Sequence, residues 1–159
     1  MIQRIQSVFL LVAALLLATL FKLNFYTAQL ENSEIRYTAW LHQNTTTNEI
    51  HINLIHIILQ FAIIGFTLYT IFSYKNRKKQ IKLAAFNILL ICGFIVLMFY
   101  SYDNAKSFLD RSFNSQGAEL STTYGIGMIL PLLSLVFNFL AIKGIRKDEE
   151  LIKSADRIR

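Results

Sequence analysis

Residues 54–74 read LIHIILQFAIIGFTLYTIFSY, a continuous apolar stretch that contains no Asp, Glu, Lys or Arg. A bilayer hydrocarbon core of about 30 Å is crossed by roughly 20 such residues in a helix. Backbone groups in lipid have to be satisfied within the segment or in a closed barrel, and the stretch lacks the alternation of a barrel strand. It therefore predicts a membrane-spanning helix.

Three further uncharged blocks lie on either side of it, at about 5–21, 83–102 and 124–142. The chain is 54% hydrophobic and only 16% charged, whereas soluble domains carry about a quarter charged residues. This composition excludes a disordered tail and a disulfide scaffold, and it argues against an ordinary soluble enzyme. We predict an all-α membrane protein, with residues 1–159 forming a single four-span bundle. The first block also resembles a signal peptide, but no small-residue cleavage site precedes Lys22, so we expect a retained anchor.

Basic residues divide unequally between the segments that join these blocks. Twelve of the 16 lie before the first block, between the second and third (75–82), or in the tail after the fourth (143–159). The other four are Lys22 and three residues in the two remaining loops, 23–53 and 103–123, which also hold six acidic residues. Because basic flanks stay in the cytoplasm, both termini are predicted there. The net charge of +6 is then explained by topology and by anionic lipid headgroups, so no nucleic acid is expected.

The segments outside the predicted spans carry some pattern of their own. Residues 24–41 alternate imperfectly around a turn-like Glu-Asn-Ser-Glu cluster at 31–34, which predicts a small β-hairpin in the first outer loop. A short helix is expected near 105–113. The tail, 143–159, repeats apolar residues at helical spacing and predicts a cytoplasmic amphipathic helix, with a solvated extension of the fourth span as the alternative.

Uncharged polar residues inside the spans define a candidate bundle interior. In the second span they recur at helical spacing, and in the fourth two of them lie four residues apart. Such groups usually hydrogen-bond between helices, and the alternative is a polar pathway or a small-ligand site. No carboxylate or lysine lies among them to drive transport, so we expect interhelical packing. The candidate interior residues are Asn53, His56, Gln60, Asn87, Ser134 and Asn138.

The sequence contains few other residues in a pattern typical of metal binding or catalysis. His42, His51 and His56 are separated by nine and five residues, a spacing that does not place them on adjacent helical turns, so no metal site is predicted. No phosphate-binding glycine loop or nucleophile elbow is present, and we expect neither catalysis nor a cofactor. Gly125 and Gly127 indicate close helix packing at the start of the fourth span, and Pro131 indicates a kink there.

The two ends of the chain carry the most specific motifs. The start MIQRIQ (1–6) and the tail segments RKDEEL (146–151) and SADRIR (154–159) resemble those of a bacterial family of small four-span inner-membrane proteins of unknown function. The resemblance implies a bacterial cytoplasmic membrane and no established activity. Both ends are predicted on one face, so a docking surface is expected from four candidate interaction residues: Arg4, Asp148, Glu149 and Arg157.

Three functions were weighed on these features. The first is a structural or accessory subunit of a larger membrane assembly, with a membrane-protein partner or a second copy of the chain in the lipid bilayer. The second is a lipid or small-molecule binding or transport protein that uses the polar face of 54–74. The third, a membrane enzyme, lacks any paired carboxylates or a base beside a nucleophile within the spans. The first is the functional prediction from sequence.

Overall fold

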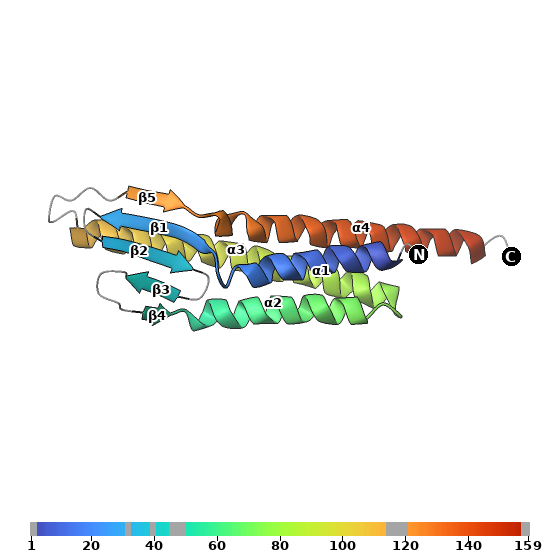
Figure 1. Cartoon of the computed structure of the whole chain (residues 1–159). Coiled ribbons are helices and arrows are strands. Elements are labelled where there is room, and N and C mark those ends of the chain that lie inside the picture. Colours follow the sequence, from blue (N-terminus) through green and yellow to red (C-terminus); the bar gives the residue numbers. More distant parts are fainter. Residues whose placement is uncertain (1–2, 31–32, 39–40, 45–49, 114–120, 157–159) are drawn as a thin grey trace.

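The computed structural model describes residues 3–30, 33–38, 41–44, 50–113 and 121–156. Within these residues four helices and five strands form a bundle capped by a sheet (Figure 1). The helices are α1 (Gln3–Thr19), α2 (Leu54–Phe72), α3 (Arg77–Phe113) and α4 (Leu130–Asp156), with a short 3₁₀ turn, η2 (Ile126–Met128), before α4. The strands are β1 (Asn24–Leu30), β2 (Ser33–Thr38), β3 (Leu41–Asn44), β4 (Ile50–Ile52) and β5 (Ser121–Tyr124).

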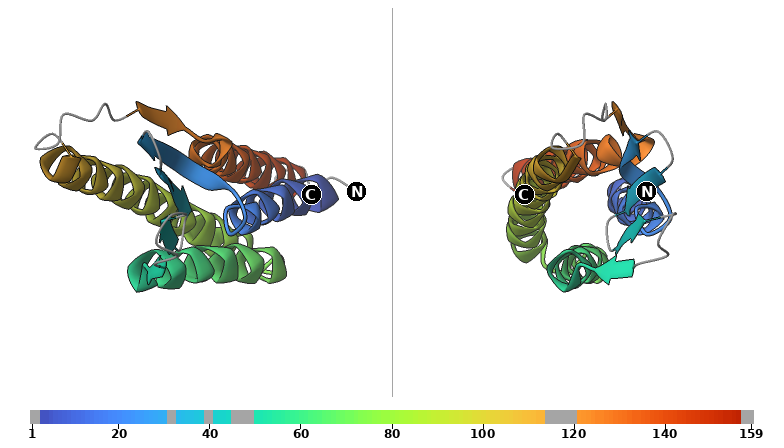
Figure 2. Two further views of the ribbon diagram at one scale, coloured as in Figure 1. Left: turned by 60° about the vertical axis from the view of Figure 1, so that its left-hand side comes forward. Right: turned by 90° about the vertical axis from the view of Figure 1, so that its left-hand side faces the viewer.

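The helices pack as a ring in which each contacts the next along the chain and α4 closes against α1. The end-on view in Figure 2 shows this order. The start of α1, the turn between α2 and α3, and the end of α4 share one end of the bundle, and the sheet lies at the other (Figure 1). Helices α2, α3 and α4 are long and apolar enough to cross a membrane, whereas the apolar part of α1, Ile5–Thr19, is shorter.

The sheet is antiparallel with strand order β4-β3-β2-β1-β5. The predicted hairpin is present as β1 and β2, which pair from Leu30 opposite Ser33 to Asn24 opposite Thr38. Strand β5 comes from the second loop and pairs with β1, with Tyr26 opposite Tyr124. The sheet is therefore larger than the hairpin that the sequence predicted, because strand pairing between distant segments leaves no local pattern.

Three predicted helix boundaries are corrected by the structure. The fourth span was expected from residue 124, but Tyr124 belongs to β5 and α4 begins at Leu130. Pro131 is then the second residue of α4, where its missing N–H breaks no hydrogen bond, so no kink is needed. The helix expected near 105–113 is the end of α3 itself. The tail likewise is not a separate helix but continues α4 without a break through Asp156, and Ile145 and Asp148 in it are buried.

The two glycines before α4 pack against a strand instead of a helix. A Cβ added to Gly125 would overlap the backbone carbonyl of Asn24, and one added to Gly127 would lie 2.7 Å from the same oxygen. The N–H of Gly125 donates to the carbonyl of Phe25 at 2.6 Å. These glycines therefore allow the chain leaving β5 to run directly against β1, which fixes the sheet to the top of α4.

Candidate functional site

The bundle interior contains a hydrogen-bonded set of uncharged polar side chains that we call the polar ladder: Gln60, Thr67, Asn87, Ser134 and Asn138. All five side chains are fully buried. At its centre, Asn87 Nδ2 of α3 donates to Thr67 Oγ1 of α2 at 2.8 Å and to Asn138 Oδ1 of α4 at 3.0 Å. One carboxamide thus joins three helices.

The ladder also hydrogen-bonds to α1, through two backbone carbonyl groups of that helix. Ser134 Oγ donates to the carbonyl of Ala13 at 3.2 Å, and Gln60 Nε2 donates to the carbonyl of Leu17 at 2.6 Å. The sequence spacing brings this about, because residues four apart, such as Ser134 and Asn138, share one face of a helix. The ladder therefore connects all four helices, in the arrangement expected of interhelical packing.

Two acceptors in the ladder make no hydrogen bond within the described part of the chain. They are Gln60 Oε1 and Asn87 Oδ1, and both are buried. A buried acceptor without a donor costs about 1–3 kcal/mol. These two oxygens are the groups in the interior that a ligand carrying a donor would meet.

The remaining predicted interior residues lie toward the sheet end of α2. His56 is buried, its Nε2 lies 3.3 Å from Ser101 Oγ, and its ring meets the edge of Phe94 at 6.0 Å between centroids. Asn53 is half-buried and precedes α2 as its N-cap residue, where its carbonyl accepts from the N–H of Ile57 at 3.2 Å. Neither residue takes part in the ladder.

The three histidines lie on three different elements. His42 of β3 and His51 of β4 are direct partners in the sheet register, a pairing that their spacing in the sequence did not reveal. His56 is on α2 and hydrogen-bonds elsewhere. Among the residues that the structure describes, no three His, Cys, Asp or Glu side chains lie close enough to hold a metal ion.

At the opposite end, α1 and α4 meet through an amide and a carboxylate. Gln6 Nε2 donates to Asp148 Oδ2 at 2.6 Å, and both side chains are buried. Gly144 permits this approach, because a Cβ there would lie 3.0 Å from Gln6 Cγ. From the sequence we predicted that the start of the chain lies near Asp148 and Glu149. Arg4 was the residue expected to take part in this contact, and Gln6 was not predicted.

The structure describes the other predicted interaction residues only in part. Glu149 is half-buried beside Asp148 on α4. Arg4 lies in the first turn of α1, but its side chain is not among those described, and Arg157 lies outside the described residues. Arg4, Asp148 and Glu149 therefore lie at one end of the molecule.

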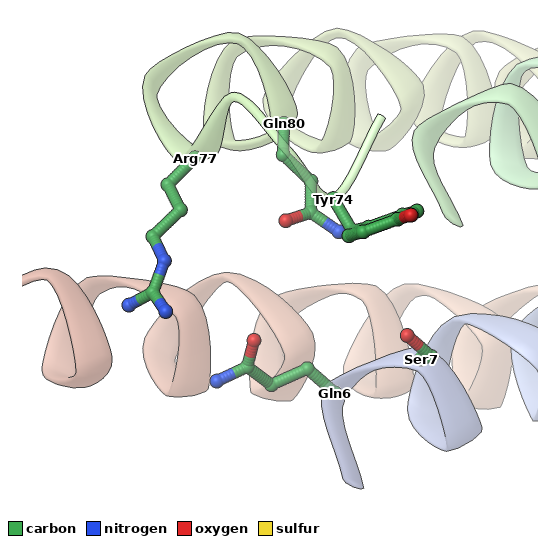
Figure 3. A pocket seen from close by; sticks show the side chains of 5 residues that line it. All are labelled: Gln6, Ser7, Tyr74, Arg77 and Gln80. Atoms are coloured by element: carbon green, nitrogen blue, oxygen red, sulfur yellow. The ribbon is translucent and has the colours of Figure 1, made fainter. Parts of the chain in front are cut away.

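A small polar pocket next to this contact was not predicted (Figure 3). It is lined by Gln6, Ser7, Tyr74, Arg77 and Gln80, and it is large enough for about one water molecule. Gln80 Nε2 donates to the carbonyl of Thr70 at 3.2 Å. One guanidinium nitrogen of Arg77 is buried and makes no hydrogen bond within the described residues. From the sequence, Arg77 was expected only as one of the basic residues that set the orientation in the membrane, because its burial depends on the turn geometry.

Three tyrosines join the sheet to α3. Tyr26 of β1 stacks on Tyr37 of β2 with 4.1 Å between ring centroids, and its edge meets Tyr102 of α3 at 4.8 Å. Burial raises the pKa of Tyr26 and of Tyr37 above the ordinary value, so both rings stay neutral across the physiological range. These tyrosines hold the sheet on the bundle.

Comparison with known families gives one match, to the family described as domain of unknown function (DUF4293), over residues 2–158. The chain belongs to this family. No curated protein matches it. Because the DUF4293 match covers both the ladder and the end motifs, neither is an addition to the family domain. The family description itself assigns no activity.

Proposed function

We propose that this DUF4293 protein is an integral membrane protein that acts as a structural or accessory subunit of a larger membrane assembly. The observation that carries the membrane assignment is the inverted distribution of polarity in the bundle. Asn87 and Asn138 are fully buried, whereas Ile55, Leu89 and Val96 are 69%, 66% and 66% exposed. The bundle thus buries these amides and exposes many large aliphatic side chains on its outer surface.

This arrangement suits lipid better than water. An apolar side chain of this size left in water forgoes about 1.5–3 kcal/mol of burial free energy, and soluble monomers rarely expose large contiguous apolar patches. In a bilayer the same surface costs nothing, and helices associate through packing and interhelical hydrogen bonds. The polar ladder supplies such hydrogen bonds.

The proposed topology places both termini in the cytoplasm of a bacterium, with the sheet on the outer face of the inner membrane. Its support is the coincidence of the basic turn 75–82 with the two ends of the chain at one end of the bundle. The opposite end carries the sheet and the acidic Asp103. Basic residues on one side of a bundle are the usual determinant of this orientation.

The subunit role is supported by how the interior is used. The side-chain donors of Asn87, Ser134 and Gln60 are engaged by neighbouring helices, so the ladder serves packing. The role needs no catalytic group and no cofactor. The second candidate, a ligand site on the polar face of α2, rests on the unpaired Gln60 Oε1 and Asn87 Oδ1.

Affinity purification in a mild detergent, followed by mass spectrometry, tests the subunit role. A stoichiometric partner, or a homo-oligomer, is expected to co-purify. Charge reversal at the docking end, Arg4→Glu or Glu149→Lys, should weaken that capture, while Asp103→Lys at the sheet end serves as the matched control. Recovery of a lone monomer with a bound small molecule would favour the second candidate, and a lone monomer without one would reject both.

A further inference from the structure

The outward face of α2 carries an apolar groove. It is lined by Ala62, Gly65, Phe66 and Tyr69 and has a volume of about 420 Å³. These residues recur at helical spacing and share one side of the helix. Gly65 opens the groove, because a Cβ at this position would meet no atom within 4 Å.

Aromatic and aliphatic side chains form the walls of the groove. On one side Phe66 of α2 packs against Phe86 of α3 with 5.3 Å between ring centroids. On the other side Phe61 and Leu68, which are 60% and 39% exposed, flank Gly65 along α2. Ala62 and Tyr69 are seven residues apart, so the groove runs for about 10 Å along the axis. It is an open, shallow groove between projecting side chains.

One end of the groove lies at the side-chain ammonium group of Lys79. Lys79 Nζ donates to Tyr69 Oη at 2.8 Å and lies 5.2 Å from the centroid of the same ring. Its partner in this hydrogen bond is a hydroxyl group and not a carboxylate, so this contact leaves the positive charge available to an anionic ligand. The turn around it is strongly basic and contains no acidic residue between α2 and the middle of α3: Lys75, Arg77, Lys78, Lys79 and Lys82.

We propose that this groove binds one anionic phospholipid, with the phosphate at Lys79 and Tyr69 and an acyl chain over Gly65. The inference rests on the proposed membrane location. The charge of the turn matches an anionic headgroup, because juxtamembrane lysines attract such lipids. The apolar lining matches hydrocarbon, and the cation sits at the end of the bundle that the topology places at the cytoplasmic headgroups.

A lipid fits the groove better than a helix of a partner protein. A helix is about 10–12 Å wide with its side chains, and the projecting Phe61 and Leu68 would hold it away from Gly65. Small residues are enriched where helices approach closely in membranes, but here Gly65 stands between bulky neighbours. A single acyl chain fits in the groove without displacing Phe61 or Leu68.

Native mass spectrometry of the full chain in detergent micelles tests the proposal. Palmitoyl-oleoyl phosphatidylglycerol and the phosphatidylcholine with the same acyl chains are titrated separately. One phosphatidylglycerol adduct per chain is expected to persist at activation energies that strip phosphatidylcholine. Gly65→Leu, which fills the groove, should weaken this adduct at least tenfold, and Lys79→Gln should weaken it about fivefold. Gly93→Leu is the matched control and should leave it unchanged, since a Cβ at Gly93 also meets open space.

The outcomes separate this site from the proposed membrane location. Alkaline extraction of native membranes tests insertion independently, and loss of the chain to the soluble fraction would remove the premise. A chain that resists extraction but binds both lipids equally rejects the site and leaves the membrane location standing. If Gly65→Leu changes the oligomer mass while the adduct survives, the groove is a contact between protein chains and the lipid proposal is wrong.

Discussion

Replacement of Asn87 by Leu tests whether the polar ladder holds the bundle together. The change removes both donations from Nδ2, one to Thr67 Oγ1 and one to Asn138 Oδ1. Thr67 keeps a partner, because its hydroxyl also donates to the carbonyl of Ile63 at 2.7 Å. Asn138 Oδ1 loses this donor inside an apolar environment. The damage is therefore concentrated on Asn138.

The expected magnitude follows from these contacts. An interhelical hydrogen bond in a membrane contributes about 0.6 kcal/mol, with a maximum of about 1.7. A buried acceptor left without its donor costs about 1–3 kcal/mol. Because the two effects overlap, and because the change also removes the unpaired Asn87 Oδ1, Asn87→Leu should lower the free energy of unfolding by about 1–2 kcal/mol. Leu89→Ala on the same helix is the control, since Leu89 is 66% exposed, and it should change little.

A double-mutant cycle with Asn138→Leu gives the decisive comparison. Once both carboxamides are gone, neither leaves the other unpaired, so the double variant should be only slightly less stable than either single variant. The expected coupling energy is about 1–1.5 kcal/mol. The assay is reversible unfolding of the detergent-solubilised chain by SDS, followed by circular dichroism. Additivity within about 0.5 kcal/mol would show that the two residues act independently and would refute the ladder as a cooperative unit.

Three further substitutions probe other contacts with the same unfolding assay. Gln6→Leu removes the donor from the buried carboxylate at the α1–α4 contact and should cost about 1.5–3 kcal/mol; an unchanged stability would mean that this contact is not formed in the detergent-solubilised chain. Gly127→Ala forces a Cβ against a backbone carbonyl and should cost about 1–3 kcal/mol, whereas Gly93→Ala should not destabilise. Tyr102→Ala removes the ring that joins α3 to the sheet and should cost about 3 kcal/mol, while the exposed Tyr100→Ala should cost under about 0.5.

The sequence predicted the helices well where a local signal exists. The apolar run that begins at Leu54 gave α2 to within two residues, because a continuous uncharged block has one stable solution in lipid. The alternation on either side of residues 31–34 gave β1 and β2. The spacing of Ser134 and Asn138 placed both on one face of α4, and the structure buries that face.

The features that sequence reasoning missed depend on non-local pairing. Strand β5 takes its partner from β1, almost a hundred residues earlier, so residues 121–123 were predicted as loop and Tyr124 as the start of a span. The same pairing explains why Gly125 and Gly127 meet a strand. Gln6 was not among the predicted interaction residues, because its partner Asp148 lies at the far end of the chain.

The central claim, an apolar exterior that faces lipid, is tested most directly at the single cysteine of the chain. Cys92 is exposed on α3, in the middle of its apolar stretch. In native membranes it should resist a water-soluble maleimide and react fully after SDS denaturation. In a Cys92→Ala background, Lys79→Cys should react only after the membrane is opened and Ser121→Cys in intact cells. Rapid labelling of Cys92 in intact, folded membranes would contradict the account.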